Sequence, residues 1–194
     1  SEDSEAEILA ALRAGITGAG DRRVVVIGHH PVRSGGEHGG HFTWKDHIFP
    51  LRVAASWLWL PLPVLGSAYP IARRSGIARQ DLSSGAYEHL RDSLEGVFRE
   101  NPPLVYASGH EHNLQVLLGG SARYNLISGG GIYDHASQVD RIDGTLFADS
   151  GCGFMRLDLL VDGRALLNVF SVTGEGRAIL RDCRWLDQEP ATPR

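Results

Sequence analysis

The sequence has little of several features that would mark a particular class of protein. Only two of its 194 residues are cysteine, Cys152 and Cys183, which could pair or stay free, so their number does not fix the redox compartment. The net charge of -4 comes without a basic stripe, which argues against nucleic acid as a partner. The N-terminus carries no signal peptide, which says nothing about secretion if the chain is a fragment. The apolar fraction of 42% and the charged fraction of 22% are those of a globular protein and exclude disorder and collagen.

Two stretches each run from a buried-strand pattern directly into Gly-His. Residues 24–27 read Val-Val-Val-Ile before the Gly-His that ends at His29, and residues 104–107 read Leu-Val-Tyr-Ala before His110 and His112. Such runs are typical of strands covered on both faces of a parallel sheet, and open α/β folds keep their chemistry at the carboxyl ends of these strands. If the two strands are neighbours, the three histidines converge, and convergent imidazoles predict a metal site.

The pair His110 and His112 also fits an ordinary turn. Histidines are common at strand ends, and a spacing of two places both rings on one face of an extended segment whether or not they bind anything. The second Gly-His, at His29, favours a shared site over an accident. Glu111, between the two histidines, is expected to point the other way. His30 is expected to support the site rather than to bind metal.

The residues around these histidines resemble the last two metal-binding blocks of the calcineurin-like metallophosphoesterases. Val-Ile-Gly-His at 26–29 with Pro31, and Gly-His-Glu-His-Asn-Leu-Gln at 109–115, carry the resemblance, which is nearest to the tartrate-resistant purple acid phosphatases. Glu-His-Gly at 37–39 and Leu-Ile-Ser-Gly-Gly-Gly at 126–131 agree in order and spacing. The resemblance covers residues 4 to 134 and implies half of a four-layer α/β/β/α sandwich with a β-rich C-terminal part.

Three earlier blocks of that family are missing from the sequence. These are Asp-x-His or Asp-x-Gly, Gly-Asp-x-x-Asp or Gly-Asp-x-x-Tyr, and Gly-Asn-His. The resemblance therefore implies that residues 1–187 are the C-terminal portion of a metallophosphoesterase domain, followed by a flexible tail at 188–194. The bridging aspartate, the asparagine ligand and one catalytic histidine would lie upstream, so the chain alone is expected to bind metal weakly and to hydrolyse phosphate esters poorly.

The resemblance also implies roles for individual residues. His29 and His110 would bind one metal ion and His112 the other, and the two ions would generate a hydroxide that attacks a phosphomonoester. Iron, zinc or manganese suit the histidine nitrogens better than calcium. His38 would protonate the leaving group, and Glu37 would orient the leaving group or the substrate. From the residues alone, the glycine-rich loop that carries both is expected to lie in solvent rather than over a site.

An apolar insertion at about 48–80 is the least understood part of the sequence. Residues 53–72 carry no charge, which invites a transmembrane interpretation by length, but Pro61, Pro63 and Pro70 argue against a regular spanning helix. The insertion is expected to pack on the domain or shape the rim of the cleft. Contact with a protein partner or a membrane surface is the alternative.

The other elements are expected from local patterns. Helices are predicted from the Ser4 capping box to a stop at Gly15, and over 81–100. Further strands are predicted at 113–118 and 124–127, and as a β-rich end at 154–161, 164–172 and 177–185. The polar, glycine-rich stretch 138–153 is expected to be a connecting loop.

Three functions remain open on this basis. The leading one is a metal-dependent phosphatase acting on phosphomonoesters, of which this chain is a part. The second is a non-catalytic surface or partner-binding module on the same fold, and the third is a mononuclear zinc hydrolase using His29, His110 and His112. Substrate, metal identity and oligomeric state are not readable from the sequence, while an extracytoplasmic location is favoured only by analogy with the family.

Overall fold

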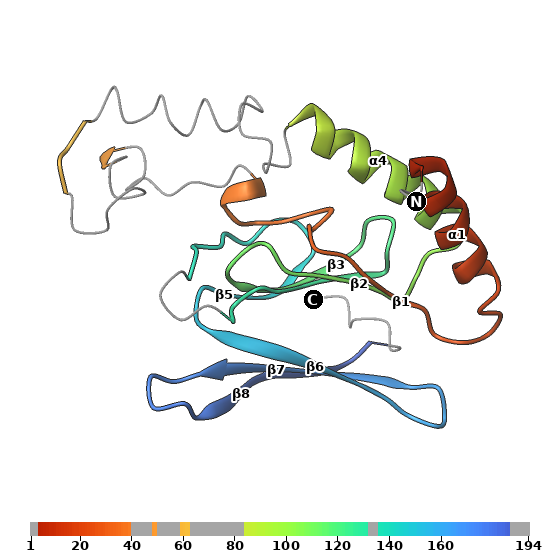
Figure 1. Cartoon of the computed structure of the whole chain (residues 1–194). Helices are drawn as coiled ribbons and strands as arrows, with labels where there is room; N and C mark the ends of the chain where they lie inside the picture. The colour runs from red at the N-terminus through yellow and green to blue at the C-terminus, as the bar shows by residue number, and fades with distance from the viewer. Residues whose placement is uncertain (1–3, 40–47, 50–58, 63–83, 132–135, 187–194) are drawn as a thin grey trace.

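A computed structural model gives the structure of the chain and describes residues 4–39, 48–49, 59–62, 84–131 and 136–186. Within this part, a pair of α-helices, a larger sheet and a smaller sheet stack as three layers (Figure 1). The α/β class predicted from the sequence is confirmed at this level, and most of the regular structure is β-strand.

The five-stranded sheet forms the middle layer and has the order β1-β2-β4-β3-β5. The three strands at one side run parallel, whereas the last two pair antiparallel with their neighbours. The bounds are β1 Val25–Ile27, β2 Val105–Ser108, β3 Leu114–Leu118, β4 Tyr124–Ser128 and β5 Thr145–Asp149. Because β1 pairs directly with β2, the two strands that lead into Gly-His are neighbours, which is the condition that the sequence analysis set for the histidines to converge.

Two sequence-based expectations fail within this sheet. The first is that 138–153 is a connecting loop, whereas β5 lies inside it and pairs with β3. The glycine-rich residues around β5 give no strand pattern. Pairing with β3, rather than the local sequence, makes this segment a strand. The second is that the first apolar run is covered on both faces. Val25 and Val26 are partly buried, but Ile27, the last residue of this edge strand, lies beyond the two apolar cores and is 80% exposed.

The three-stranded sheet forms the outer layer on the side away from the helices. It has the order β6-β7-β8 with antiparallel pairing throughout, and its bounds are β6 Gly153–Leu159, β7 Ala165–Val172 and β8 Ala178–Trp185. The predicted Asp162-Gly163 turn joins the first two strands, and Gly163 has the positive φ of 85° that such a turn requires. The β-rich C-terminal part is therefore confirmed.

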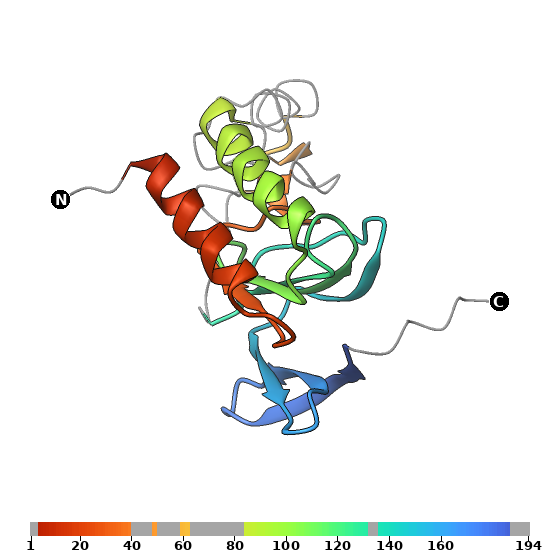
Figure 2. The same ribbon diagram turned by 90° about the vertical axis from the view of Figure 1, so that its right-hand side faces the viewer.

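Two helices cover the other face of the larger sheet (Figure 2). Helix α1, Glu5–Thr17, begins with the predicted capping box at Ser4, and α4, Gly85–Glu100, is capped by the Ser84 side chain. The predicted stop at Gly15 is wrong, since the helix runs on to its cap at Gly18. One glycine near a helix end weakens the helix without ending it when the next turn packs.

The larger sheet separates two apolar cores. On the helix side, Phe98 of α4 and Tyr106 of β2 are buried together with residues of α1. On the other side, Leu114 and Val116 of β3 pack against Leu167 of β7 and its neighbours. The middle layer is thus buried on both faces at β2, β3 and β4, whereas β1 at its edge is only partly covered.

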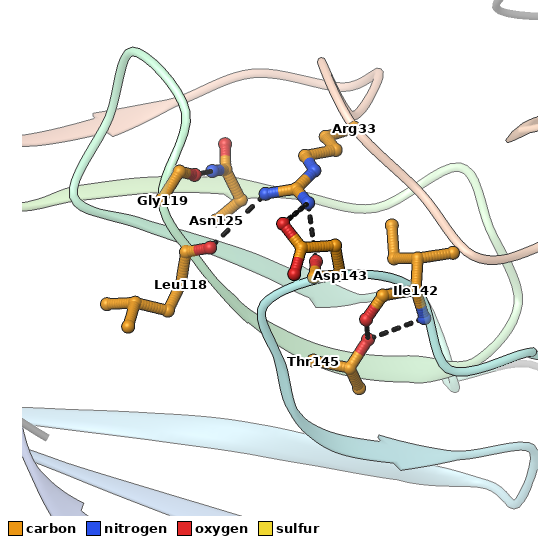
Figure 3. Close-up of polar contacts among 7 residues, drawn as sticks. All are labelled: Arg33, Leu118, Gly119, Asn125, Ile142, Asp143 and Thr145. Carbon is orange, nitrogen blue, oxygen red and sulfur yellow. Dashed lines mark hydrogen bonds and ion pairs between the residues drawn. The ribbon is translucent and has the colours of Figure 1, made fainter. Parts of the chain in front are cut away.

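A cluster around Arg33 ties the segment after β1 to the far side of the sheet (Figure 3). The Arg33 guanidinium donates hydrogen bonds to the carbonyl of Leu118, at 3.2 Å, and to the carbonyl of Asp143, whose carboxylate lies 3.8 Å away. In the same cluster the Asn125 amide donates to the Gly119 carbonyl at 2.9 Å. The segment that follows the first histidines is therefore anchored at its start.

The predicted apolar insertion lies mostly outside the described residues. Its two described parts, 48–49 and 59–62, meet: Leu62 N–H donates to the Ile48 carbonyl at 2.7 Å, and the rings of Phe49 and Trp59 are in edge contact at 5.2 Å. Trp59 is nevertheless 53% exposed. Among the described residues, the structure contains no helix with the length and apolar character needed to span a membrane.

Candidate metal centre

Backbone pairing continues beyond the carboxyl ends of β1 and β2. The Gly28 amide donates to the Ala107 carbonyl at 2.9 Å, and the Gly109 amide donates to the His29 carbonyl at 3.1 Å. His110 follows with a φ of +63°, a left-handed conformation that is uncommon outside glycine. This turn brings the His110 ring back over the end of β1, beside His29.

Three imidazoles meet at this edge of the sheet. The ligating nitrogens of His29, His30 and His110 all lie within 4.8 Å of one another, and His110 Nδ1 is 3.3 Å from His29 Nε2. The structure thus brings together two of the three histidines predicted as metal ligands. His30 joins them in place of His112 in this cluster, because its segment bends after β1 and the alternation of side chains that holds within a strand no longer applies.

The separation of the His29 and His110 nitrogens is compatible with a shared metal ion. Two nitrogens at about 2.0–2.1 Å from one tetrahedral zinc ion are about 3.3 Å apart, which matches the separation of the His29 and His110 nitrogens. The same distance also allows a hydrogen bond between two neutral imidazoles. Burial, with the neighbouring rings of His29 and His38, lowers the pKa of His30 below its usual value of 6.5 and favours the neutral form that binds metals.

Two tyrosines hold the backbone that carries the first two histidines. The Tyr106 hydroxyl of β2 donates to the His30 carbonyl at 2.8 Å, and the Tyr87 hydroxyl of α4 donates to the Pro31 carbonyl. Gly28 makes room for this arrangement, because a Cβ there would lie 2.2 Å from the Tyr106 hydroxyl. A larger residue before His29 would therefore have to displace the Tyr106 ring.

The predicted catalytic pair lies next to the cluster in the short 3-10 helix η1, Glu37–Gly39. The His38 ring contacts the His110 ring with centroids 4.2 Å apart. The carboxylate of Glu37, which is half-buried, is near enough to Glu111 to raise the pKa of that residue. The loop that could have hung in solvent thus folds back over the histidines in the structure.

Glu111 points into the protein, opposite to His110, as the sequence suggested. Its side chain is 1% exposed, and its Oε1 accepts hydrogen bonds from Ser34 Oγ at 2.8 Å and from the His38 amide at 3.0 Å. Burial raises the pKa of this carboxyl from 4.5 to about 7, and the nearby Glu37 adds to the effect. The hydrogen bonds oppose this rise but do not cancel it.

The Glu111 contact belongs to a buried polar network that sequence reasoning missed. Gln115, which is fully buried, donates to Ser34 Oγ at 3.1 Å and to Asn113 Oδ1 at 2.8 Å, and its own carbonyl accepts from the Gly35 amide at 2.8 Å. The sequence does contain a signal for this network. Asn113 and Gln115 stand at the start of an apolar strand, and buried amide side chains need hydrogen-bond partners.

His112 is not part of the imidazole cluster. Among the described residues, the group whose ligating nitrogens lie within 4.8 Å of one another contains His29, His30 and His110 alone. The His112 carbonyl accepts from the Ser137 amide at 2.9 Å. Its assignment to a second ion therefore stays a prediction, as do the metal roles of the other histidines.

The donor set also limits the chemistry of the described part. All three clustered ligands are neutral when they bind, and within the described ranges no carboxylate joins them in that group. Two cations held close together need an anionic bridge to offset their repulsion. The cluster thus suits a single ion, and a second ion would need ligands from elsewhere.

A hollow of about 410 Å³ lies away from the histidines, at the amino ends of β1 and β2. Arg22, Arg23 and Arg123 line it, together with the end of α1. Arg22 donates to the Gly18 and Ala19 carbonyls and Arg23 to the Gly163 carbonyl. These guanidinium groups tie turns together, so the candidate site remains the histidine cluster.

Comparisons with known proteins agree with the fold and do not assign a family. No protein-family model and no curated protein matches the sequence. Among solved structures, the chain is similar to GAP50, described as the anchor in the inner membrane complex of Plasmodium, with a TM-score of 0.52 and 17% sequence identity. The match covers 94% of this chain but 42% of that one, so the chain spans less than half the length of this neighbour. At this identity the likeness supports the fold alone.

Proposed function

We propose that this chain supplies the histidine part of a metal-dependent phosphatase that hydrolyses phosphomonoesters. The observation that carries the proposal is the meeting of His29, His30 and His110 at the carboxyl ends of two neighbouring parallel strands, with the His38 ring against His110. The contact between these rings supports the proposal independently of the motif resemblance, because the spacing of histidines in a sequence does not require their rings to meet.

The residues of this chain would divide the work between binding and proton transfer. His29 and His110, with His30 beside them, would hold one ion, and His112 would contribute to a second. Such ions, when bound, stabilise the charge on the phosphoryl group and lower the pKa of the attacking water towards about 7. His38 would donate a proton to the leaving oxygen, which departs poorly as an alkoxide, and Glu37 would orient the leaving group.

The rest of the site would come from polypeptide that the complete protein adds. An anionic bridge is the missing element of a two-ion site. A fourth, helical layer, which the α/β/β/α sandwich requires, would cover the outer face of the three-stranded sheet. That face carries a stacked pair of rings, Phe154 and Phe170, at 5.0 Å, with Leu180 paired beside Phe170. Phe154 and Leu180 are 44% and 51% exposed, and a covering layer would bury these apolar side chains.

The proposal is tested by assaying the complete protein and this chain on para-nitrophenyl phosphate. The complete protein should turn the ester over in the presence of zinc, iron or manganese and lose activity to a chelator, while the 194-residue chain alone should be nearly inactive. His110→Ala should reduce the rate of the complete protein by at least about 100-fold, since the loss of a ligand exceeds that of an outer partner. Full activity of the isolated chain would refute the division of the site.

Two other functions are tested by the same material. A mononuclear zinc hydrolase is favoured by the neutral three-histidine cluster, and one tightly bound ion per complete protein would support it, whereas two ions support the dinuclear proposal. A non-catalytic surface or partner-binding module is the other candidate, and the 53% exposure of Trp59 in the apolar insertion favours it. For that module, metal binding without phosphatase activity is the expected result.

A further inference from the structure

We propose that Glu111 is a positioning residue that holds His38 against His110. This inference rests on the proposed function, in which His38 protonates the leaving group. Glu111 lies next to His110 in the chain and is bound through space to the loop that carries His38. It is therefore placed to fix the separation of two rings that belong to segments more than seventy residues apart in sequence.

The contacts show how the loop closes around the carboxylate. One oxygen of Glu111 accepts from the Ser34 hydroxyl at 2.8 Å and from the His38 amide at 3.0 Å. The Ser34 hydroxyl also accepts from the Gly36 amide at 2.9 Å. Residues 34–38 therefore form a short turn whose first and last residues both donate to Glu111. A Cβ on Gly36 would lie 2.4 to 2.6 Å from the Glu111 carboxylate atoms, so only glycine lets the backbone pass this close.

The turn around Glu111 sends its side chain and the His110 ring to opposite sides. The His110 backbone is left-handed, with a φ of +63°, and its ring lies in the imidazole cluster. The Glu111 side chain, in contrast, enters the core and is 1% exposed. The His38 amide donates to the Glu111 carboxylate, and the His38 ring contacts the His110 ring with centroids 4.2 Å apart. Removing the carboxylate should free the loop and separate the rings.

A role in stability alone is a weaker account of this residue. A buried carboxylate is rarely the best choice for stability, because desolvation offsets much of what its hydrogen bonds contribute. Glu111 Oε2 makes no hydrogen bond of normal geometry within the described part of the chain, although the Gly39 amide is near enough to lower the pKa of the group. Such a group is expected where position matters more than stability.

The first experiment measures ring contact in the metal-free 194-residue chain by nuclear Overhauser spectroscopy. The wild type should give a contact between His38 and His110 ring protons. Glu111→Ala should abolish it, whereas Glu111→Gln should keep it, because the amide oxygen still accepts from Ser34 and His38. Should Glu111→Ala not fold, Ser34→Ala removes one of the two bonds and should weaken the contact. Asn125→Ala is the matched control, since it deletes a buried hydrogen bond at the Gly119 turn and should leave the contact intact.

The second experiment measures the leaving-group dependence of the complete protein. Glu111→Ala should slow hydrolysis of ethyl phosphate by on the order of 100-fold, the usual effect of losing general acid catalysis, and that of para-nitrophenyl phosphate much less. Glu111→Gln should restore most of the difference. An unchanged ring contact in a folded Glu111→Ala or Ser34→Ala variant, or equal losses on both esters, would overturn the inference. An inactive wild type would refute the proposed function, while the ring contact would still test the positioning.

Discussion

Gly129→Ala should lower the free energy of unfolding by more than about 3 kcal/mol, a loss at the top of the range for overpacking. A Cβ at Gly129 would lie 1.8 Å from the Glu111 carbonyl oxygen and 2.8 Å from the Glu111 carbonyl carbon. Both atoms belong to the backbone, so no side-chain rotation can relieve the clash. The histidine turn at 109–113 would have to move away from β4, and the imidazole cluster would be disturbed with it.

Gly131→Ala is the matched control for this prediction. It makes the same chemical change two residues later, where a Cβ would meet no atom of the described residues within 4 Å. Its effect should stay within about 0.5 kcal/mol, as for most surface substitutions. Urea denaturation of both variants and the wild type measures the difference. Equal stability of the two variants would show that the turn does not pack against Gly129 as described.

The second large effect is a fall in stability with rising pH that depends on Glu111. The folded protein raises the pKa of this carboxyl from 4.5 to about 7, so the folded state binds its proton more tightly than the unfolded state. The stabilisation is fully present below pH 4.5 and is lost as the pH rises through 7. Between pH 5 and 8 the free energy of unfolding should fall by on the order of 2–3 kcal/mol from this group.

The measurement compares the wild type with Glu111→Gln across that pH range. The amide cannot ionise, so the stability of the variant should lack this component, and the other titrating groups cancel in the difference. Urea titrations at a series of pH values supply the curves. Parallel curves for the two proteins would mean that the buried carboxyl does not titrate in this window.

Much of the fold follows from local sequence patterns. The apolar runs of β1 and β2, the Ser4 capping box and the Asp162-Gly163 turn each act within a few residues, so their elements could be predicted. β5 could not, because it is held mainly by pairing with β3 across a distance in sequence. The stacking of the helices and the two sheets as three layers also depends on surfaces that local patterns do not encode.

The candidate site could be predicted in part. His29 and His110 were found because each follows a strand, and parallel strands place their carboxyl ends together. His30 was expected only to support the site, and its place within the cluster depends on a bend after β1 and on hydrogen bonds from Tyr106 and Tyr87. The link from Glu111 to His38 was missed, since it joins residues far apart in sequence.

Zinc titration of the 194-residue chain by calorimetry tests the central claim most directly, namely that the imidazoles of His29, His30 and His110 share one ion. The wild type should bind one zinc ion, and His110→Ala should weaken binding by at least about 100-fold. His89→Ala, which changes a histidine paired with Glu5 on the helices at 2.9 Å, should bind as the wild type does. Absence of zinc binding by the wild type, or equal affinities for the two variants, would contradict the account.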